Sequence, residues 1–77
     1  MDDLPIIRRA MLRAVHRERE RQDSLHPQQA NRADQMVVLM EEVGEVAQAI
    51  QDGDEVAIQR ELVHVAAYAI RMIEDGI

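Results

Sequence analysis

A chain of 77 residues with a net charge of −6 and no cysteine is long enough for one small domain, residues 1–77. The absence of cysteine excludes disulfides, thiolate zinc sites and a cysteine nucleophile. A chain this short buries only about 60% of the surface that it exposes when unfolded. We therefore expect it to gain stability from a second copy of itself, as a homodimer or homotetramer, and from a metal held by carboxylates and imidazoles.

The composition predicts an all-α fold. The sequence is 47% apolar but has a single aromatic residue, Tyr68, and its three glycines and two prolines supply few turns for a sheet. No apolar run approaches the roughly 20 residues of a membrane span, and the start of the chain does not resemble a signal peptide. We expect a cytoplasmic protein that does not contact membranes.

Charge is distributed unevenly along the chain. Residues 1–33 carry a net charge of +2, whereas residues 34–77 carry −8. A protein that binds duplex nucleic acid needs a basic face, so the acidic second half argues against that class of partner. It is suited to binding cations, or to forming a solvated surface.

The first predicted helix runs from about Leu4 to Arg21, with Pro5 in its first turn. Its apolar stripe is narrow and consists of Ile7, Met11, Leu12 and Val15. We expect the segment Gln22–Pro27 to interrupt the helix, because a residue before proline is disfavoured in the helical region.

Two further helices of about 20 residues each follow. The second starts near Asn31, a plausible N-cap, and ends at Gln51–Gly53. Asp54 can cap the third, which continues to about Asp75. Because only two or three residues join them, we expect an antiparallel hairpin that assembles with a second subunit into a helical bundle.

The second helix carries acidic residues on the side opposite its main apolar stripe. At 100° per residue, Glu41, Glu42 and Glu45 fall within one arc, and Val38 and Ala49 share that arc. The apolar stripe contains Met36, Leu39, Met40, Val43, Val46, Ala47 and Ile50. A solvated acidic face is the ordinary interpretation of this pattern, but the apolar neighbours favour a face that is covered.

The third helix places a carboxylate and an imidazole in apolar surroundings. Ten of the twelve residues from Leu62 to Ile73 are apolar and lie all around the helix. Glu61 projects from an apolar face, so it needs a metal or a buried arginine to compensate its charge. His64 lies one turn further on and points the same way, either as a ligand or as an ordinary core residue.

The hairpin can bring these two groups together. Glu42 and Glu45 on one helix would then face Glu61 and His64 on the other. Three carboxylates and an imidazole that converge between helices form a site for a divalent cation.

These residues resemble the motifs of the all-α nucleoside triphosphate pyrophosphohydrolases of the MazG type. That family carries Glu-Glu-x-x-Glu on one helix and Glu-x-x-Asp on the next. The corresponding stretches here are Glu41–Glu45 and Glu61–His64, and the similarity covers roughly residues 34–75. The stretch Glu18–Gln22 is also similar to the start of small, phage-type members.

The resemblance implies hydrolysis of a (deoxy)nucleoside triphosphate at its α–β phosphoanhydride, giving the monophosphate and pyrophosphate. It implies Mg²⁺ as the cofactor and Glu42, Glu45 and Glu61 as its ligands. By the same resemblance Glu41 is catalytic, as a further ligand or by orienting the attacking water. His64 stands where the family has aspartate, which makes it the fourth metal-binding residue and makes Mn²⁺ a possible cofactor, since imidazole is a softer ligand than carboxylate.

The substrate-binding residues are less sharply indicated. The chain ends directly after the third helix, so we expect a second subunit to complete the nucleoside pocket. Arg13 and Arg17 are candidate contacts for the triphosphate, because guanidinium pairs well with phosphate oxygens. Tyr68 is a third candidate substrate-binding residue.

Two other functions remain open. Because His64 replaces an aspartate, the chain can instead be a catalytically impaired MazG-like binding or assembly module. Alternatively, Glu61-x-x-His64 matches the Glu-x-x-His motif of di-iron carboxylate bundles, in which other helices donate one glutamate each.

Overall fold

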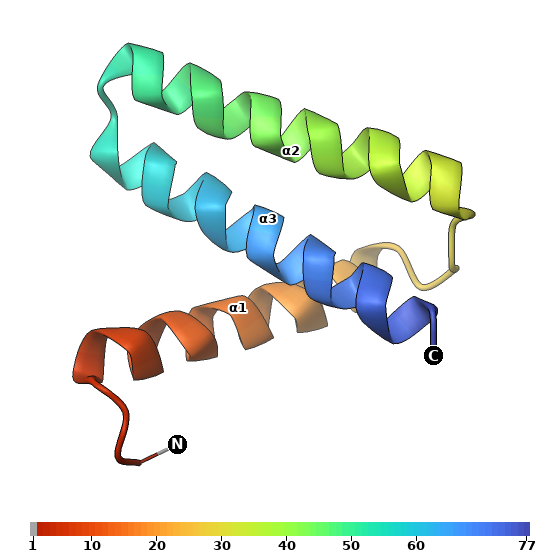
Figure 1. Cartoon of the computed structure of the whole chain (residues 1–77), viewed down its shortest axis with the longest axis horizontal. Coiled ribbons are helices and arrows are strands. Elements are labelled where there is room, and N and C mark those ends of the chain that lie inside the picture. Colours follow the sequence, from red (N-terminus) through yellow and green to blue (C-terminus); the bar gives the residue numbers. More distant parts are fainter. Residues whose placement is uncertain (1) are drawn as a thin grey trace.

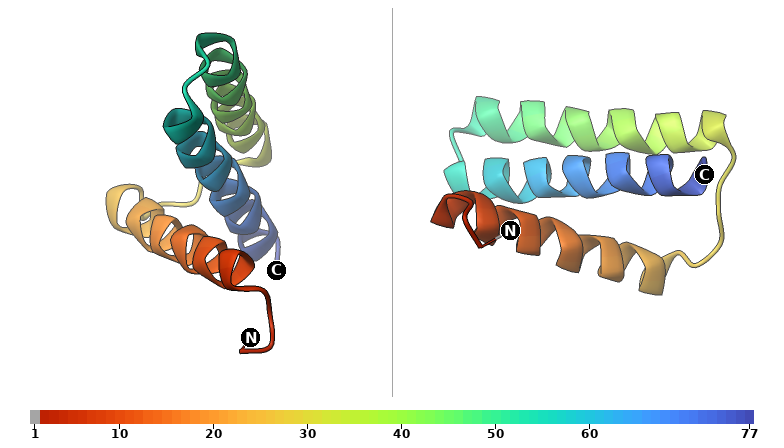
Figure 2. Two further views of the ribbon diagram at one scale, coloured as in Figure 1. Left: turned by 90° about the vertical axis from the view of Figure 1, so that its left-hand side faces the viewer. Right: turned by 60° about the horizontal axis from the view of Figure 1, so that its bottom comes forward.

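The computed structural model describes residues 2–77 as three helices without a strand. They are α1 (Ile6–Leu25), α2 (Arg32–Asp52) and α3 (Glu55–Asp75). The helix α3 lies between the other two and packs against both, whereas α1 and α2 do not pack against each other (Figures 1 and 2). The all-α prediction is confirmed, and so is the antiparallel hairpin of α2 and α3 (Figure 1).

The ends of α2 and α3 follow the predicted capping signals. The Asn31 side chain accepts a hydrogen bond of 2.9 Å from the amide of Asp34 at the start of α2. At the start of α3, the Asp54 side chain accepts a hydrogen bond of 3.1 Å from the amide of Ala57. Gly53 ends α2 with a φ of 67°, in the left-handed region where glycine pays no steric cost.

The predicted end of the first helix is wrong by four residues. The helix α1 continues through Gln22 to Leu25 and stops at His26, directly before Pro27. Apart from its own backbone, proline restricts only the residue directly before it, His26, so the residues from Gln22 to Leu25 can remain helical. Gln22 is buried, and its carbonyl oxygen accepts hydrogen bonds from the backbone of His26 and from Arg71. Pro5 is the N-cap of α1, one position before the helical residues.

The apolar core between the helices is small. Among the described residues, the buried hydrophobic side chains are those of Ala49, Ala57, Ala67 and Tyr68. Alanine lets the helices approach closely, but it removes little apolar surface from water. Burial within one chain therefore supplies a limited hydrophobic contribution to stability.

Buried polar side chains fasten the helices at the C-terminal end of α3. Arg71 is 6% exposed and donates hydrogen bonds to the carbonyl oxygens of Gln22, His26 and Gln28, in and after α1. The fully buried Gln35 of α2 donates 2.8 Å to the Asp75 carboxylate. These hydrogen bonds of Arg71 and Gln35 connect α1 and α2 to α3 near the open end of the hairpin.

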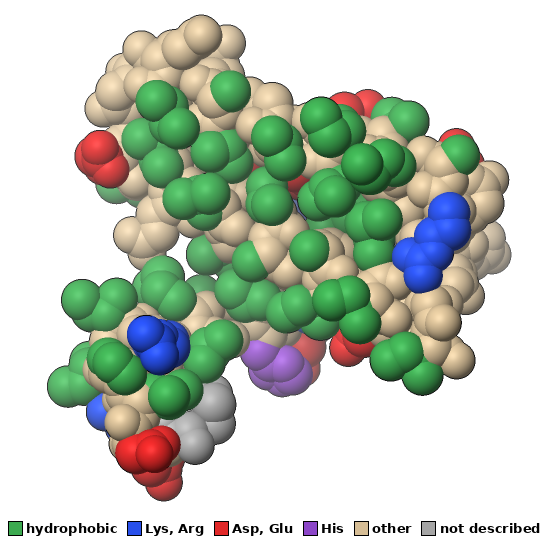
Figure 3. Space-filling model, in the orientation of Figure 1, with side chains coloured by type: hydrophobic (Ala, Val, Ile, Leu, Met, Phe, Trp, Pro, Cys, Tyr) green, Lys and Arg blue, Asp and Glu red, His purple; other side chains and the backbone are tan. Residues whose placement is uncertain are grey.

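The main apolar stripe of α2 does not form the core. Met36, Met40, Val43 and Ile50 are between 41% and 59% exposed, and α2 instead packs Gln35 and Ala49, on the side that carries Glu42, against α3. Leu62, Ile70 and Ile73 of α3 are exposed as well. Hydrophobic side chains gather over α2 and α3 on one face of the molecule (Figure 3). The chain thus leaves an extended apolar surface in contact with solvent.

None of the helices within residues 2–77 combines the length and the apolar character that crossing a membrane requires.

Candidate metal centre

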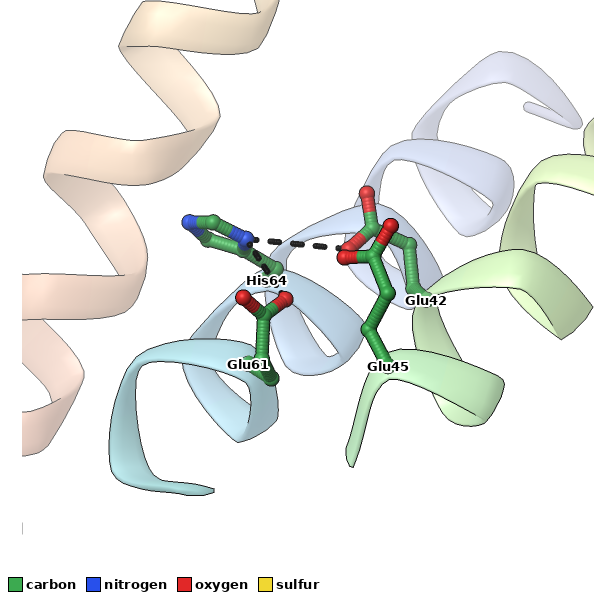
Figure 4. A group of neighbouring side chains, drawn as sticks. All are labelled: Glu42, Glu45, Glu61 and His64. Atoms are coloured by element: carbon green, nitrogen blue, oxygen red, sulfur yellow. Dashed lines mark ion pairs between the residues drawn. The ribbon is translucent and has the colours of Figure 1, made fainter. Parts of the chain in front are cut away.

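Four side chains from α2 and α3 converge between the helices of the hairpin. Glu42 and Glu45 project from α2, and Glu61 and His64 project from α3, each pair being one turn apart (Figure 4). One ligand atom from each of the four lies within 4.8 Å of the others. The hairpin thus brings together the four residues that the sequence predicts to bind the metal.

The imidazole of His64 lies among carboxylates. Its Nδ1 is 3.3 Å from Glu61 Oε2 and 3.6 Å from Glu42 Oε2. Its Nε2 is 3.7 Å from Oε1 of Glu18, a residue of α1. All three helices therefore contribute to the surroundings of His64.

Two carboxylate oxygens in the cluster have no hydrogen-bond partner. Glu42 Oε2 and Glu61 Oε2 are buried and accept no hydrogen bond from the described residues. Glu61 as a whole is 9% exposed, and Arg60 engages only its other oxygen, with Nε at 3.3 Å from Oε1. A buried carboxylate oxygen without a partner costs free energy. A cation among these oxygens would remove that cost, so the residues present fit a divalent metal ion.

Without a metal, the carboxyl groups of the cluster differ in how readily they ionise, as the directions of their pKa shifts indicate. Burial raises the pKa of Glu42, against the lowering influence of His64. A hydrogen bond with Glu61 raises the pKa of Glu45. Burial opposes ionisation of Glu61 as well, but hydrogen bonds with Glu45 and Arg60 hold its pKa below the ordinary value. Glu45 therefore holds a proton more readily and Glu61 less readily, which is the behaviour of two close carboxyl groups that share a proton.

The remaining predicted site residues lie around this cluster rather than in it. Glu41 is exposed on α2 and offers no atom to the four-residue cluster. Tyr68 is 8% exposed and lines a cavity of about 530 Å³ together with Glu42, Glu45 and His64. Arg13 is exposed on α1 and lines neither this cavity nor the next one described.

A second cavity, of about 580 Å³, shares Glu18, Arg21 and His64 with the first. Arg17, Arg21 and Arg60 line it, and so do Glu18 and His64. Of the two arginines predicted to contact substrate, Arg17 thus lies beside the cluster. The cavity combines three guanidinium groups with one edge of the carboxylate site.

The sequence did not single out Glu18, Arg21 or Arg60 as site residues. Glu18 lies one turn beyond Val15 and two beyond Met11, so it continues the side of α1 that faces α3. This helical spacing was the sequence signal that could have placed Glu18 beside α3. Arg60 precedes Glu61 directly, and nothing in the sequence separates it from an ordinary surface arginine.

Comparisons with protein-family profiles, with curated proteins and with solved structures find no match to this chain. The similarity to MazG-type proteins therefore consists of short motifs, Glu41–Glu45 on α2, Glu61–His64 on α3 and the stretch Glu18–Gln22 on α1.

Proposed function

We propose that the chain is a metal-dependent nucleoside triphosphate pyrophosphohydrolase, which converts a (deoxy)nucleoside triphosphate and water to the monophosphate and pyrophosphate. The observation that carries the proposal is the convergence of Glu42, Glu45, Glu61 and His64 between two antiparallel helices, with two buried oxygens left without partners. The MazG-like motifs on the same helices support this choice of reaction.

The four clustered residues would hold the cation. Carboxylate oxygens suit Mg²⁺, and the His64 imidazole shifts the preference toward Mn²⁺. A divalent cation bound there would neutralise phosphate charge and activate a water molecule for attack on the α-phosphorus. Because Glu61 is buried and Glu42 is partly buried, their charges would act on the cation with less screening by water than those of exposed carboxylates.

Arginine and glutamate side chains near the cluster could bind the triphosphate and orient the attacking water. Arg17, Arg21 and Arg60 line a cavity that borders His64, where guanidinium groups can pair with the oxygens of a triphosphate. Glu41 is exposed on α2 and directly precedes Glu42 in the sequence. A carboxylate in that position can orient the attacking water and accept its proton.

A homodimer completes the proposal. The chain exposes 5667 Å², whereas a compact monomer of 8.8 kDa exposes about 4,800 Å². The excess of about 900 Å² is close to the roughly 800 Å² that each partner buries in a stable interface. The exposed stripe Met36–Met40–Val43–Ile50 of α2 offers apolar side chains for this contact, and a second copy of the chain is the occupant that we propose.

Release of pyrophosphate from a panel of ribo- and deoxyribonucleoside triphosphates, first with Mg²⁺ and then with Mn²⁺, tests the activity. We expect the wild-type protein to release pyrophosphate and the Glu61→Gln variant to release none. Glu55→Gln removes the same charge from an exposed position in the first turn of α3, so it should retain the activity. A folded wild-type protein that releases no pyrophosphate with either metal would refute the hydrolase proposal.

A catalytically impaired binding module is the second candidate, and the position of His64 within the cluster favours it. Replacing a carboxylate by a neutral imidazole removes one negative charge from the site. Binding of a triphosphate and Mn²⁺ without turnover would identify this module. Iron in the purified protein, with ultraviolet absorption from an oxo-bridged pair, would instead indicate the di-iron alternative.

A further inference from the structure

Glu18 is the one carboxylate of α1 that reaches the candidate metal centre. Its side chain is 11% exposed and lies against α3, with Oε1 at 3.7 Å from Nε2 of His64. Its other oxygen, Oε2, accepts a hydrogen bond of 2.9 Å from Nη1 of Arg21. Arg21 thus holds one oxygen of the carboxylate, and the other oxygen faces the imidazole.

The two nitrogens of His64 face different groups. Nδ1 lies toward Glu61 and Glu42, the carboxylates of the proposed metal site, and Nε2 lies on the opposite side, toward α1 (Figure 4). A neutral imidazole carries one proton, and only the nitrogen without it can bind a metal. For Nδ1 to be the ligand, the proton has to be on Nε2, and the carboxylate beside Nε2 is that of Glu18, at 3.7 Å, which a small movement of the ring would bring within hydrogen-bond distance.

We propose that Glu18 is a positioning residue, which in the metal-bound protein accepts a hydrogen bond from the Nε2–H group of His64 and thereby presents Nδ1 to the metal. This inference rests on the metal centre proposed above. A carboxylate behind a metal-binding histidine fixes the orientation of the ring and its protonated nitrogen, and its loss commonly weakens metal binding by about 10- to 100-fold.

The arrangement also gives α1 a role in the site. Because α1 packs against α3 and not against α2, the hairpin alone supplies the four ligands but leaves Nε2 of His64 without an acceptor. Glu18 brings that acceptor from the third helix. Metal binding through His64 should therefore depend on α1, although no ligand belongs to it.

A double-mutant cycle on the full chain measures this dependence. The affinity for Mn²⁺ alone is determined by calorimetry for the wild type, Glu18→Ala, His64→Ala and the double variant. Glu18→Ala should weaken Mn²⁺ binding by about 10- to 100-fold in the wild-type background and have little effect once His64 is alanine. Glu18→Gln retains an acceptor oxygen and should recover part of the affinity. Glu20→Ala is the matched control, because it removes the same charge from an exposed position of α1 that pairs with His16.

A spectroscopic measurement on the zinc-loaded protein gives a readout that is independent of turnover. Nitrogen-15 chemical shifts should show His64 bound through Nδ1 and protonated at Nε2 in the wild type. In Glu18→Ala this pattern should weaken or be lost.

The outcomes separate the positioning role from the metal centre itself. If Glu18→Ala weakens Mn²⁺ binding equally with and without His64, Glu18 acts through its charge alone; the inference is then overturned and the metal centre stands. Failure of the folded wild type to bind Mn²⁺ or Zn²⁺ overturns both. Should Glu18→Ala not fold, the same comparison is made with Glu18→Gln in the two backgrounds.

Discussion

Met40 lies in the middle of the apolar stripe that α2 exposes, and its replacement by lysine tests the proposed dimer. Its side chain is 55% exposed in the single chain. If a second copy covers the stripe, Met40→Lys places an ammonium group in a dry contact, once in each subunit.

The size of the effect follows from the exposure. Full burial of a methionine side chain is worth about 1.5–3 kcal/mol, so covering the exposed half contributes about 1 kcal/mol per subunit. Loss of both contributions costs about 2 kcal/mol and raises the dissociation constant about 30-fold. Desolvation of the two ammonium groups adds to this, so about 30-fold is the lower bound.

Sedimentation equilibrium of wild type, Met40→Lys and Gln48→Lys measures that constant. Gln48 is exposed on α2, away from the stripe, and donates a hydrogen bond to Asp52, so a lysine is accommodated there. We expect wild type and Gln48→Lys to be dimers and Met40→Lys to dissociate. A wild type that remains monomeric at tens of micromolar, or a Met40→Lys dimer as tight as the control, would refute the reasoning.

Three further predictions concern the site and the fold. His64→Asp introduces the aspartate that MazG-type motifs carry at this place and should raise Mg²⁺-dependent pyrophosphate release; unchanged turnover would place residue 64 away from the metal. Burial raises the pKa of Glu42 above 4.5, so this group's contribution to the stability of the metal-free protein falls as the pH rises from about 4.5 through its folded-state pKa. Glu42→Gln should therefore raise the free energy of unfolding at pH 7 and leave it nearly unchanged at pH 4, as measured by chemical denaturation; equal effects at both pH values would contradict this. Gly53→Ala should destabilise the fold by about 1 kcal/mol because of its positive φ. Gly44→Ala, in an open stretch of α2, should stabilise it by about 0.5–1 kcal/mol, and the opposite ranking of the two melting temperatures would be inconsistent with the structure.

Local signals were sufficient to predict α2 and α3. Asn31, Gly53 and Asp54 act through their own backbone and side chains, so their effects can be recognised without knowledge of the tertiary fold. The end of α1 was mistaken, because the polar residues after Arg21 were interpreted as a break although only His26 is constrained by proline. Tertiary contacts of Gln22 with Arg71 stabilise the extra turn.

The convergence of the four clustered residues was predictable because it needs only two helical spacings and a short turn. The exposure of the apolar stripe of α2 was not predicted, since that stripe is the stronger sequence signal for a core, whereas Gln35 and Ala49 are the residues that α2 buries. Glu18 was likewise missed as a site residue. The helical spacing places Glu18 on the side of α1 that faces α3, but its contact with His64 depends on how α1 crosses α3.

A crystal structure of the protein with Mn²⁺ and a non-hydrolysable nucleoside triphosphate tests the central claim most directly. The proposal predicts anomalous manganese density bound by Glu42, Glu45, Glu61 and Nδ1 of His64, with the phosphates extending from that metal into the cavity that contains Arg17. Manganese bound elsewhere, or a triphosphate bound away from these four side chains, would contradict it.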